Sequence, residues 1–116
     1  MFRKVLSSKI HRAKISEANL EYEGSITIPQ DLLDATGIRP FEAVAVWDIT
    51  NGSRFETYAI IGDKPGHICV NGAAAHLVSP GDLIIIANFN YQLEETLKGY
   101  QPKIVFVDAN NQITGS

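Results

Sequence analysis

Polar and apolar side chains alternate along much of the chain, and this pattern predicts short strands. Ser25–Ile28 alternates with a period of two, as expected for a strand with one buried face. The apolar runs Ala43–Ile49 and Phe55–Ile61 are separated by Asn51-Gly52, which is a strong hairpin signal because both residues tolerate positive φ. The pattern therefore predicts one half-buried strand followed by a hairpin.

Two later segments also have the composition of strands. Leu83–Ala87 is apolar at every position, which favours a strand buried on both faces. Ile104–Val107 is the last candidate strand. The segment that follows, Asp108–Ser116, is polar, and we expect it to be loosely ordered.

Helices are predicted in only three places. Pro29–Thr36 begins with a proline, which suits a first helical turn, and Gly37 follows where a helix cap is expected. Tyr91–Lys98 is predicted as a second helix, and Gly72–His76 as a short helical turn. The sequence therefore predicts a mainly β fold with a few short helices.

A weak internal repeat suggests how the strands are arranged. Ile38–Glu42 and Val78–Asp82 each follow a short helical segment, lead into a strand and place an acid two residues after proline. Two such units suit a small pseudo-symmetric barrel, which has no exposed sheet edges. The repeat alone does not decide the architecture.

Length and charge limit the possible functions. The 116 residues suit a single domain, which buries roughly 65% of its unfolded surface and has no room for a deep internal cavity. We therefore expect an active site on a rim or between subunits. The formal net charge of −3 argues against a nucleic-acid partner bound by bulk electrostatics.

The single cysteine, the N-terminal residues and the lack of a membrane-length segment predict a soluble cytoplasmic protein. Cys69 is the single cysteine and lies in an apolar run, so we expect a buried structural thiol in a reducing compartment. Met1–Leu6 is basic without the apolar stretch of a signal peptide, and no segment reaches membrane-spanning length. The histidines do not show ligand spacing with cysteine or carboxylates, so no metal site is predicted.

Gly24-Ser25 is the pair that bears on chemistry. Taken alone, it predicts a bend followed by a strand. Ser25 lacks the Gly-x-Ser-x-Gly elbow of a hydrolase, because Tyr22 and Glu23 precede Gly24. His11 is the only base near it in sequence, so a serine hydrolase is the weakest of the interpretations that we considered.

Four sequence motifs, taken together, suggest a different role for Gly24-Ser25. They are Lys9–Ala13, Tyr22–Ile26, Asn51–Tyr58 and Val70–His76. Their order and spacing resemble the bacterial pyruvoyl-dependent aspartate 1-decarboxylases, over about residues 1–87. The resemblance implies a small double-psi β-barrel that decarboxylates L-aspartate to β-alanine, for pantothenate and coenzyme A biosynthesis. It also implies a homotetramer with active sites between neighbouring subunits.

The resemblance further implies that the chain makes its own cofactor. The Ser25 hydroxyl would attack the Gly24 carbonyl, and the chain would separate into a β chain of residues 1–24 and an α chain of residues 25–116. Ser25 would become a pyruvoyl group, a small built-in ketone that accepts electrons during decarboxylation. Glycine before the serine leaves the carbonyl open to attack. The sequence does not indicate whether a maturation factor is needed.

Roles for charged and hydroxyl side chains also follow from the resemblance. Lys9 and Arg54 would bind the substrate carboxylates, with no assignment of which cation meets which carboxylate. Tyr58 would donate a proton at Cα, and Thr57 would bind substrate or polarise the Gly24 carbonyl during cleavage. Their side chains should point to opposite faces of a regular strand.

The resemblance places small residues on the opposite wall of the site. Asn71 would offer a hydrogen bond, and backbone amides would approach the ligand at the small residues Gly72, Ala73 and Ala74. Asn71 would also serve as an ordinary helix cap, and the two roles are compatible. Tyr22 and His11 match positions near the processing site.

A second resemblance supports a different function. Ile26–Leu33 with Thr36–Glu42 is similar to the swapped-hairpin DNA-binding transcription regulators. The similarity covers barely a quarter of the chain and concerns scaffold residues, and a shared barrel would explain it. The only basic cluster lies between Arg3 and Lys14, so DNA binding is the alternative rather than the main interpretation.

Overall fold

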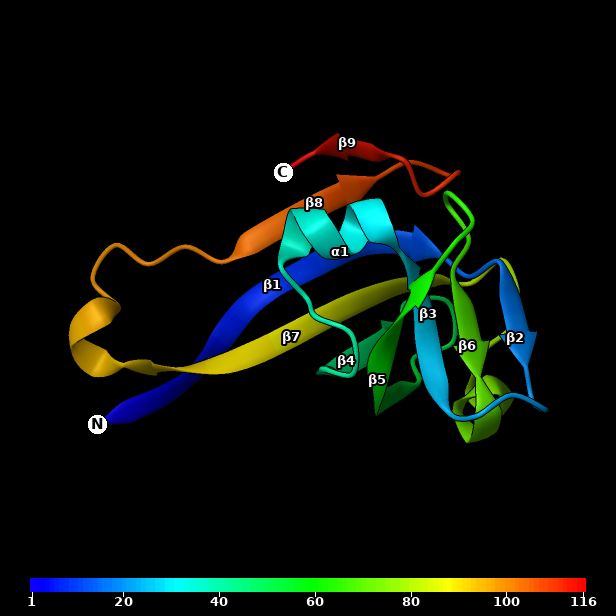
Figure 1. Cartoon of the computed structure of the whole chain (residues 1–116), viewed down its shortest axis with the longest axis horizontal. Helices are drawn as coiled ribbons and strands as arrows, with labels where there is room; N and C mark the ends of the chain where they lie inside the picture. The colour runs from blue at the N-terminus through cyan, green and yellow to red at the C-terminus, as the bar shows by residue number, and fades with distance from the viewer.

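The computed structural model describes all 116 residues, and strands dominate it (Figure 1). The strands are β1 (Phe2–Lys14), β2 (Glu17–Asn19), β3 (Ser25–Pro29), β4 (Ala43–Asp48), β5 (Arg54–Gly62), β6 (Cys69–Asn71), β7 (Leu83–Leu93), β8 (Lys103–Val107) and β9 (Ile113–Gly115). The five strands predicted from the sequence correspond to β3, β4, β5, β7 and β8 and are confirmed. The four others, β1, β2, β6 and β9, were not predicted as strands.

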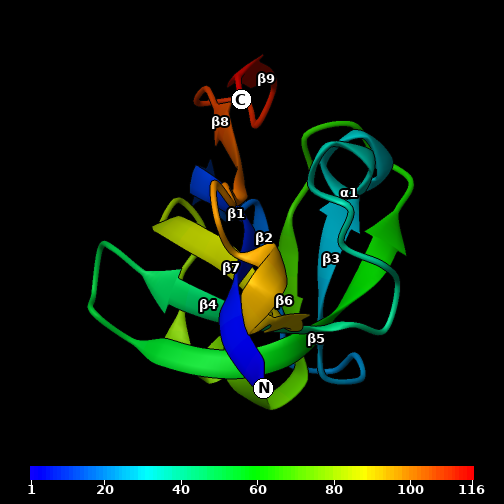
Figure 2. The same ribbon diagram turned by 90° about the vertical axis from the view of Figure 1, so that its left-hand side faces the viewer.

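The nine strands form one sheet, and the chain itself links β1 to the far end of the sheet at β2. The order is β2-β6-β3-β5-β4-β7-β1-β8-β9. Strand β2 lies at one end of this order, but in the chain it follows β1 after only two residues, Ile15 and Ser16. One continuous stretch of chain therefore connects β1 to the opposite end of the sheet. The Ser16 amide donates to the Ile68 carbonyl over 2.8 Å, which connects the stretch to the residues before β6. The mainly β fold, built as a small barrel, is confirmed (Figure 2).

The barrel interior is filled by branched aliphatic side chains from alternate strand positions. Ile26 and Ile28 of β3, Val44 and Val46 of β4, and Ile84 of β7 are all essentially fully buried. Burial of one such side chain contributes roughly 1.5–3 kcal/mol. Because inward and outward positions alternate along a strand, the intervening residues lie on the outer face. These are Ser25 and Thr27 on β3, and Ala43 and Ala45 on β4.

The helices are short, and two of the three were predicted correctly. Helix α1 (Gln30–Thr36) follows Pro29 and ends at Gly37, whose φ of 77° is left-handed and whose amide donates to the Leu33 carbonyl over 2.8 Å. The turn predicted at Gly72–His76 is a 3-10 helix, η1 (Gly72–Leu77). A second 3-10 helix, η2, spans only Glu94–Thr96.

The helix predicted for Tyr91–Lys98 is wrong for Tyr91–Leu93, and only Glu94–Thr96 within it is helical, as η2. Strand β7 continues to Leu93 because β1 runs antiparallel beside it, with Phe2 opposite Leu93 and Lys4 opposite Tyr91. The loosely ordered segment predicted at Asp108–Ser116 is also wrong in part, since Ile113–Gly115 forms β9 against β8. The first error arises because the partner strand β1 lies far away in the sequence, whereas β9 pairs with the preceding strand β8 in a hairpin that the polar composition of the segment concealed.

The first half of β1 and the second half of β7 extend beyond the barrel as a two-stranded arm. The arm accounts for the elongated outline in Figure 1, where the longest dimension is 44 Å. Phe2, Tyr91 and Leu93 on this arm are exposed apolar side chains. None of the helices has the length and apolar character needed to cross a membrane.

Candidate active site

Ser25 opens β3 and its hydroxyl is held from one side. The side chain is 1% exposed. Asn71 lies directly opposite on β6, and its Nδ2 donates to Ser25 Oγ and to Thr27 Oγ1, both over 3.0 Å. Ser25 Oγ in turn donates to the Glu23 carbonyl over 3.2 Å. The hydroxyl therefore has a fixed position beside the Gly24–Ser25 peptide.

Gly24 and Gly72 bring two backbone segments into direct contact. Gly72 has a φ of 74°, and a Cβ added there would lie 2.6 Å from Gly24 Cα and 2.7 Å from Gly24 N. Any residue with a side chain would therefore strain its own backbone and push away the Gly24 backbone. A Cβ at Gly24 would instead meet only the Asn71 carbonyl, at 4.0 Å. Gly72 thus fixes the backbone before Ser25 and leaves its other side open.

Tyr58 lies on the strand next to Ser25. Strands β3 and β5 run parallel with Ile26 opposite Ala59, so the preceding residues Ser25 and Tyr58 are neighbours on the outer face. Tyr58 is half-buried and lines an open pocket of about 440 Å³. The pocket residues are Phe41, Ala43, Glu56, Thr57 and Tyr58. This volume lies within the range of small-molecule sites.

Thr57 and Tyr58 point to opposite sides of β5. Tyr58 is opposite the exposed Ala43, whereas Thr57 is opposite Val44, whose side chain lies in the core. Arg54 shares the outer face with Tyr58, and its guanidinium lies 4.5 Å from the centroid of the Trp47 ring. This stacking orients a cation toward the solvent beside the strand pair. Arg54 lines a second pocket, of about 350 Å³, which shares Ala43 and Glu56 with the Tyr58 pocket.

Comparison with known proteins identifies the family. The family model for aspartate decarboxylase matches residues 1–114. The aspartate 1-decarboxylase of Legionella pneumophila strain Lens is 60% identical over 113 residues, which cover 97% of this chain and 85% of the relative. That of Corynebacterium efficiens is 55% identical over 114 residues, with 97% and 84% covered. The chain belongs to the aspartate decarboxylase family. A match of this length includes the segment that resembles the DNA-binding regulators, so a shared scaffold explains that likeness.

One half of the site expected from the family resemblance lies together within a single chain. Gly24, Ser25, Asn71, Gly72 and Tyr58 are brought together by β3, β5 and the junction of β6 with η1. Ala73 and Ala74 continue from Gly72 in η1. Tyr22 is near them, because a Cβ at Gly72 would lie 3.2 Å from the Tyr22 carbonyl oxygen, although its side chain is exposed.

The other half lies elsewhere on the same chain. Lys9 is on β1 opposite Ala87, and strands β7, β4 and β5 lie between β1 and β3. Three strands therefore separate Lys9 from Ser25 along the sheet. His11 packs edge-on against Phe106, with ring centroids 5.6 Å apart. Burial, and then the charges of Lys9 and Arg12, lower the pKa of His11.

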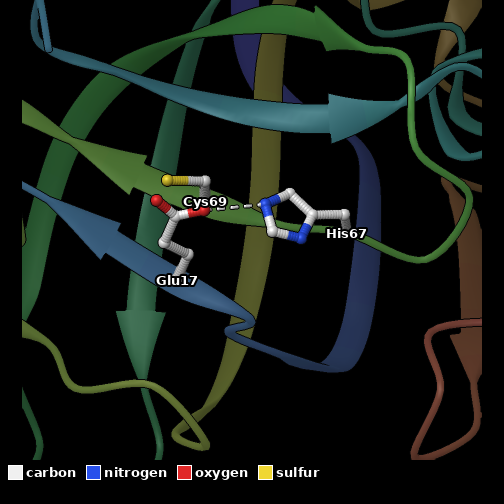
Figure 3. A group of neighbouring side chains, drawn as sticks. All are labelled: Glu17, His67 and Cys69. Atoms are coloured by element: carbon white, nitrogen blue, oxygen red, sulfur yellow. Dashed lines mark hydrogen bonds and ion pairs between the residues drawn. The ribbon is translucent and has the colours of Figure 1, made fainter.

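The structure also forms a group that the sequence analysis missed. Glu17, His67 and Cys69 place one potential metal-ligating atom each within 4.8 Å of one another (Figure 3). His67 and Cys69 are two residues apart, a spacing that puts both side chains on one face of a strand. That spacing was the only available signal, since Glu17 arrives through the β2–β6 pairing. Cys69 is buried as predicted, and burial, followed by the Glu17 charge, raises its pKa.

Proposed function

We propose that the chain is an aspartate 1-decarboxylase that cleaves itself at Gly24–Ser25 and uses a pyruvoyl group formed from Ser25. The observation that carries this proposal is the position of the Ser25 hydroxyl, buried and hydrogen-bonded by Asn71 next to a Gly24 backbone packed on Gly72. A structural serine at the start of a strand needs neither feature. Membership of the aspartate decarboxylase family supplies the reaction class and the substrate.

The proposed cleavage balances with groups of this chain and water. Ser25 Oγ bonds to the Gly24 carbonyl carbon, the Gly24–Ser25 C–N bond breaks, and an ester replaces the amide. Elimination then releases the Gly24 carboxylate and leaves a dehydroalanine, and water converts this residue to pyruvoyl and ammonia. Asn71 keeps the hydroxyl in place, while the Thr57 hydroxyl polarises the Gly24 carbonyl.

The residues around Ser25 fit a small ketone at this position. Ser25 is the first residue of β3, and the side of Gly24 that faces away from Gly72 is unobstructed. The pocket of about 440 Å³ at the neighbouring Tyr58 can hold an amino acid. The pyruvoyl group supplies the electron-withdrawing carbonyl that decarboxylation requires. Tyr58 then donates the proton that replaces carbon dioxide at Cα. The small residues Ala73 and Ala74 continue the wall that begins at Asn71 and Gly72.

Two cations hold the carboxylates of L-aspartate in this proposal. Arg54 offers a planar pair of donors, and its stacking on Trp47 limits the orientations that it can adopt. Lys9 provides the second charge from a neighbouring subunit, because three strands separate it from Ser25 along the sheet of one chain. Tyr22 and His11 complete the processing site.

The separation of Lys9 from Ser25 along the sheet supports a homotetramer with active sites between subunits. Both pockets along β5 are open at the surface, and the arm of β1 and β7 carries exposed apolar side chains suited to a second copy. We further propose that the enzyme works in the cytoplasm without a nucleic-acid or membrane partner, in keeping with its net charge of −3 and single cysteine.

Intact mass spectrometry of denatured protein tests the proposal. Purified chain incubated with L-aspartate should show two polypeptides, residues 1–24 and 25–116, together with β-alanine and carbon dioxide. The Ser25→Ala variant should remain one polypeptide and release no carbon dioxide. Release of carbon dioxide from aspartate by that variant would show that the pyruvoyl assignment is wrong.

A further inference from the structure

The group formed by Glu17, His67 and Cys69 has the composition of a metal site. The three side chains converge from β2, from the start of β6 and from the segment that precedes β6 (Figure 3). Glu17 is directly opposite Cys69 in the parallel β2–β6 pair, and Glu17 Oε1 lies 3.1 Å from His67 Nε2. The strand register therefore holds two of the three groups in place, and a short contact already joins the third.

The donor atoms are those that zinc prefers. Thiolate, imidazole and carboxylate bind zinc at about 2.0–2.3 Å, and three protein ligands leave a fourth position for water. Atoms bound to one tetrahedral zinc lie roughly 3.3–3.8 Å apart. The present group, within 4.8 Å, needs a contraction of about one ångström. The exposed Glu17 side chain can provide this movement. Hard cations such as calcium and magnesium prefer oxygen ligands and are excluded by the sulfur.

An ion can reach the group from solvent. Glu17, His67 and Cys69 all line a pocket of about 410 Å³, which also includes Asn71 and Tyr22. Cys69 is buried, whereas His67 is half-buried and Glu17 is exposed. The pocket thus combines a buried thiol with two more accessible ligands.

The group is also linked to Ser25. Cys69 Sγ donates to Asn71 Oδ1 over 3.1 Å, and the other end of the same amide, Nδ2, donates to Ser25 Oγ. The thiol therefore helps to set which end of the amide faces Ser25. A zinc-bound thiolate has lost its proton to solvent and repels Oδ1, so the amide loses the contact that orients it.

We propose that Glu17, His67 and Cys69 bind a zinc ion, and that the bound ion slows cleavage at Gly24–Ser25 by releasing Asn71 from Cys69. The effect on cleavage rests on the proposed function, whereas binding of the ion does not. The site acts on maturation of the uncleaved chain, in which Ser25 still carries its hydroxyl. Asn71 is here a positioning residue between the ion and the serine.

Cobalt spectroscopy tests the site on uncleaved Ser25→Ala protein, so that processing cannot interfere. One Co²⁺ should bind per chain with the visible bands of a tetrahedral complex and an ultraviolet thiolate-to-cobalt band, and Zn²⁺ should displace it. Cys69→Ser should lose the thiolate band, and His67→Ala should bind at least ~10-fold more weakly. His76→Ala, which removes an exposed histidine outside the group, should behave like the parent. A bound cobalt without the thiolate band, or equal losses in His67→Ala and His76→Ala, would overturn the site.

The cleavage rate tests the link to Ser25. Fresh uncleaved wild-type protein is followed on a denaturing gel with a chelator or with saturating zinc, and zinc should slow cleavage several-fold. In Glu17→Gln, which keeps the side-chain shape, the zinc concentration for half-inhibition should rise at least ~10-fold. An unchanged wild-type rate in zinc overturns the link. Absence of cleavage in the chelator would instead contradict the proposed self-processing and leave the cobalt result standing.

Discussion

Thr57 and Tyr58 show how single residues on one strand serve different steps. Their side chains face the inside and the outside of the barrel, as their partners Val44 and Ala43 indicate. Tyr58 lies on the face of β5 that is next to Ser25, whereas Thr57 lies on the other face. Cleavage and turnover should therefore be separable by substitutions at adjacent positions.

Tyr58→Phe retains the ring and removes the acidic proton. We expect normal cleavage and a loss of β-alanine formation of roughly 10²–10⁴-fold. Thr57→Val retains the shape and removes the hydroxyl, and we expect slow or absent cleavage. A denaturing gel measures processing and a β-alanine assay measures turnover. Wild-type turnover in Tyr58→Phe would make Tyr58 a packing residue and direct the search for the proton donor to a bound water.

Asp48 should make stability depend on pH. Its Oδ1 accepts from the amides of Thr50 and Asn51, while Oδ2 is buried without a donor. Burial first, and the Asp82 side chain second, raise the pKa of Asp48 above its ordinary value of 3.8. The folded chain therefore holds this proton more tightly than the unfolded chain. The free energy of unfolding should fall as the pH rises from 3.8 through the higher folded pKa.

Asp48→Asn tests this dependence. The amide retains an oxygen for the two backbone donors and adds a hydrogen-bond donor toward Asp82. We expect a free energy of unfolding at pH 7 that equals or exceeds that of the wild type, and a flatter profile between pH 4 and 7. Urea titrations at several pH values measure it, with Asp63→Asn at an exposed carboxyl as the control. A steeper fall in the variant would contradict the assignment.

At the scale of elements, the site depends on the contact between the turn before β3 and the start of η1. Gly72 and Gly52 both have positive φ, at 74° and 81°, but only Gly72 touches another segment. Alanine at either position introduces the same backbone strain, of order 1 kcal/mol. Only at Gly72 does the new Cβ also collide with Gly24. A comparison of alanine variants at Gly72 and Gly52 therefore separates the effect of backbone strain from the effect of displacing the Gly24 backbone.

Gly72→Ala should therefore reduce the cleavage rate strongly, whereas Gly52→Ala should cleave at close to the wild-type rate. Gly72→Ala should also lose more thermal stability, because the Gly24 backbone must move by several tenths of an ångström or more. The measurements are gel-based cleavage and thermal unfolding of both variants. Equal cleavage rates in the two variants would show that the contact with Gly24 does not position the peptide.

For the whole molecule, the arm of β1 and β7 is the surface that we assign to assembly. Tyr91 is 68% exposed, so its replacement removes little from the fold of one chain. Tyr91→Asp should shift the sedimentation of the protein toward smaller species and reduce β-alanine formation, since Lys9 would no longer reach a neighbouring site. Ile49→Asp, at an exposed apolar position at the end of β4, is the control. Active wild-type enzyme that sediments only as a monomer would contradict the assembly.

The sequence determined those features of the fold that depend on local geometry. The period of two in Ser25–Ile28, the Asn51-Gly52 hairpin and the Pro29 and Gly37 boundaries of α1 are all local, and the structure confirms them. The order and spacing of four sequence motifs also predicted the family. They nominated the Gly24–Ser25 pair and Tyr58, which the structure places as neighbours.

Tertiary structure alone decided what depends on partners distant in the chain. Tyr91–Leu93 is strand rather than helix because Phe2–Lys4, at the start of β1, supplies its hydrogen bonds. The contact of Gly72 with Gly24 and the meeting of Glu17 with His67 and Cys69 also follow from pairing between segments distant in the chain. Strand pairing satisfies backbone groups between segments as much as 91 residues apart, and no local pattern encodes that choice.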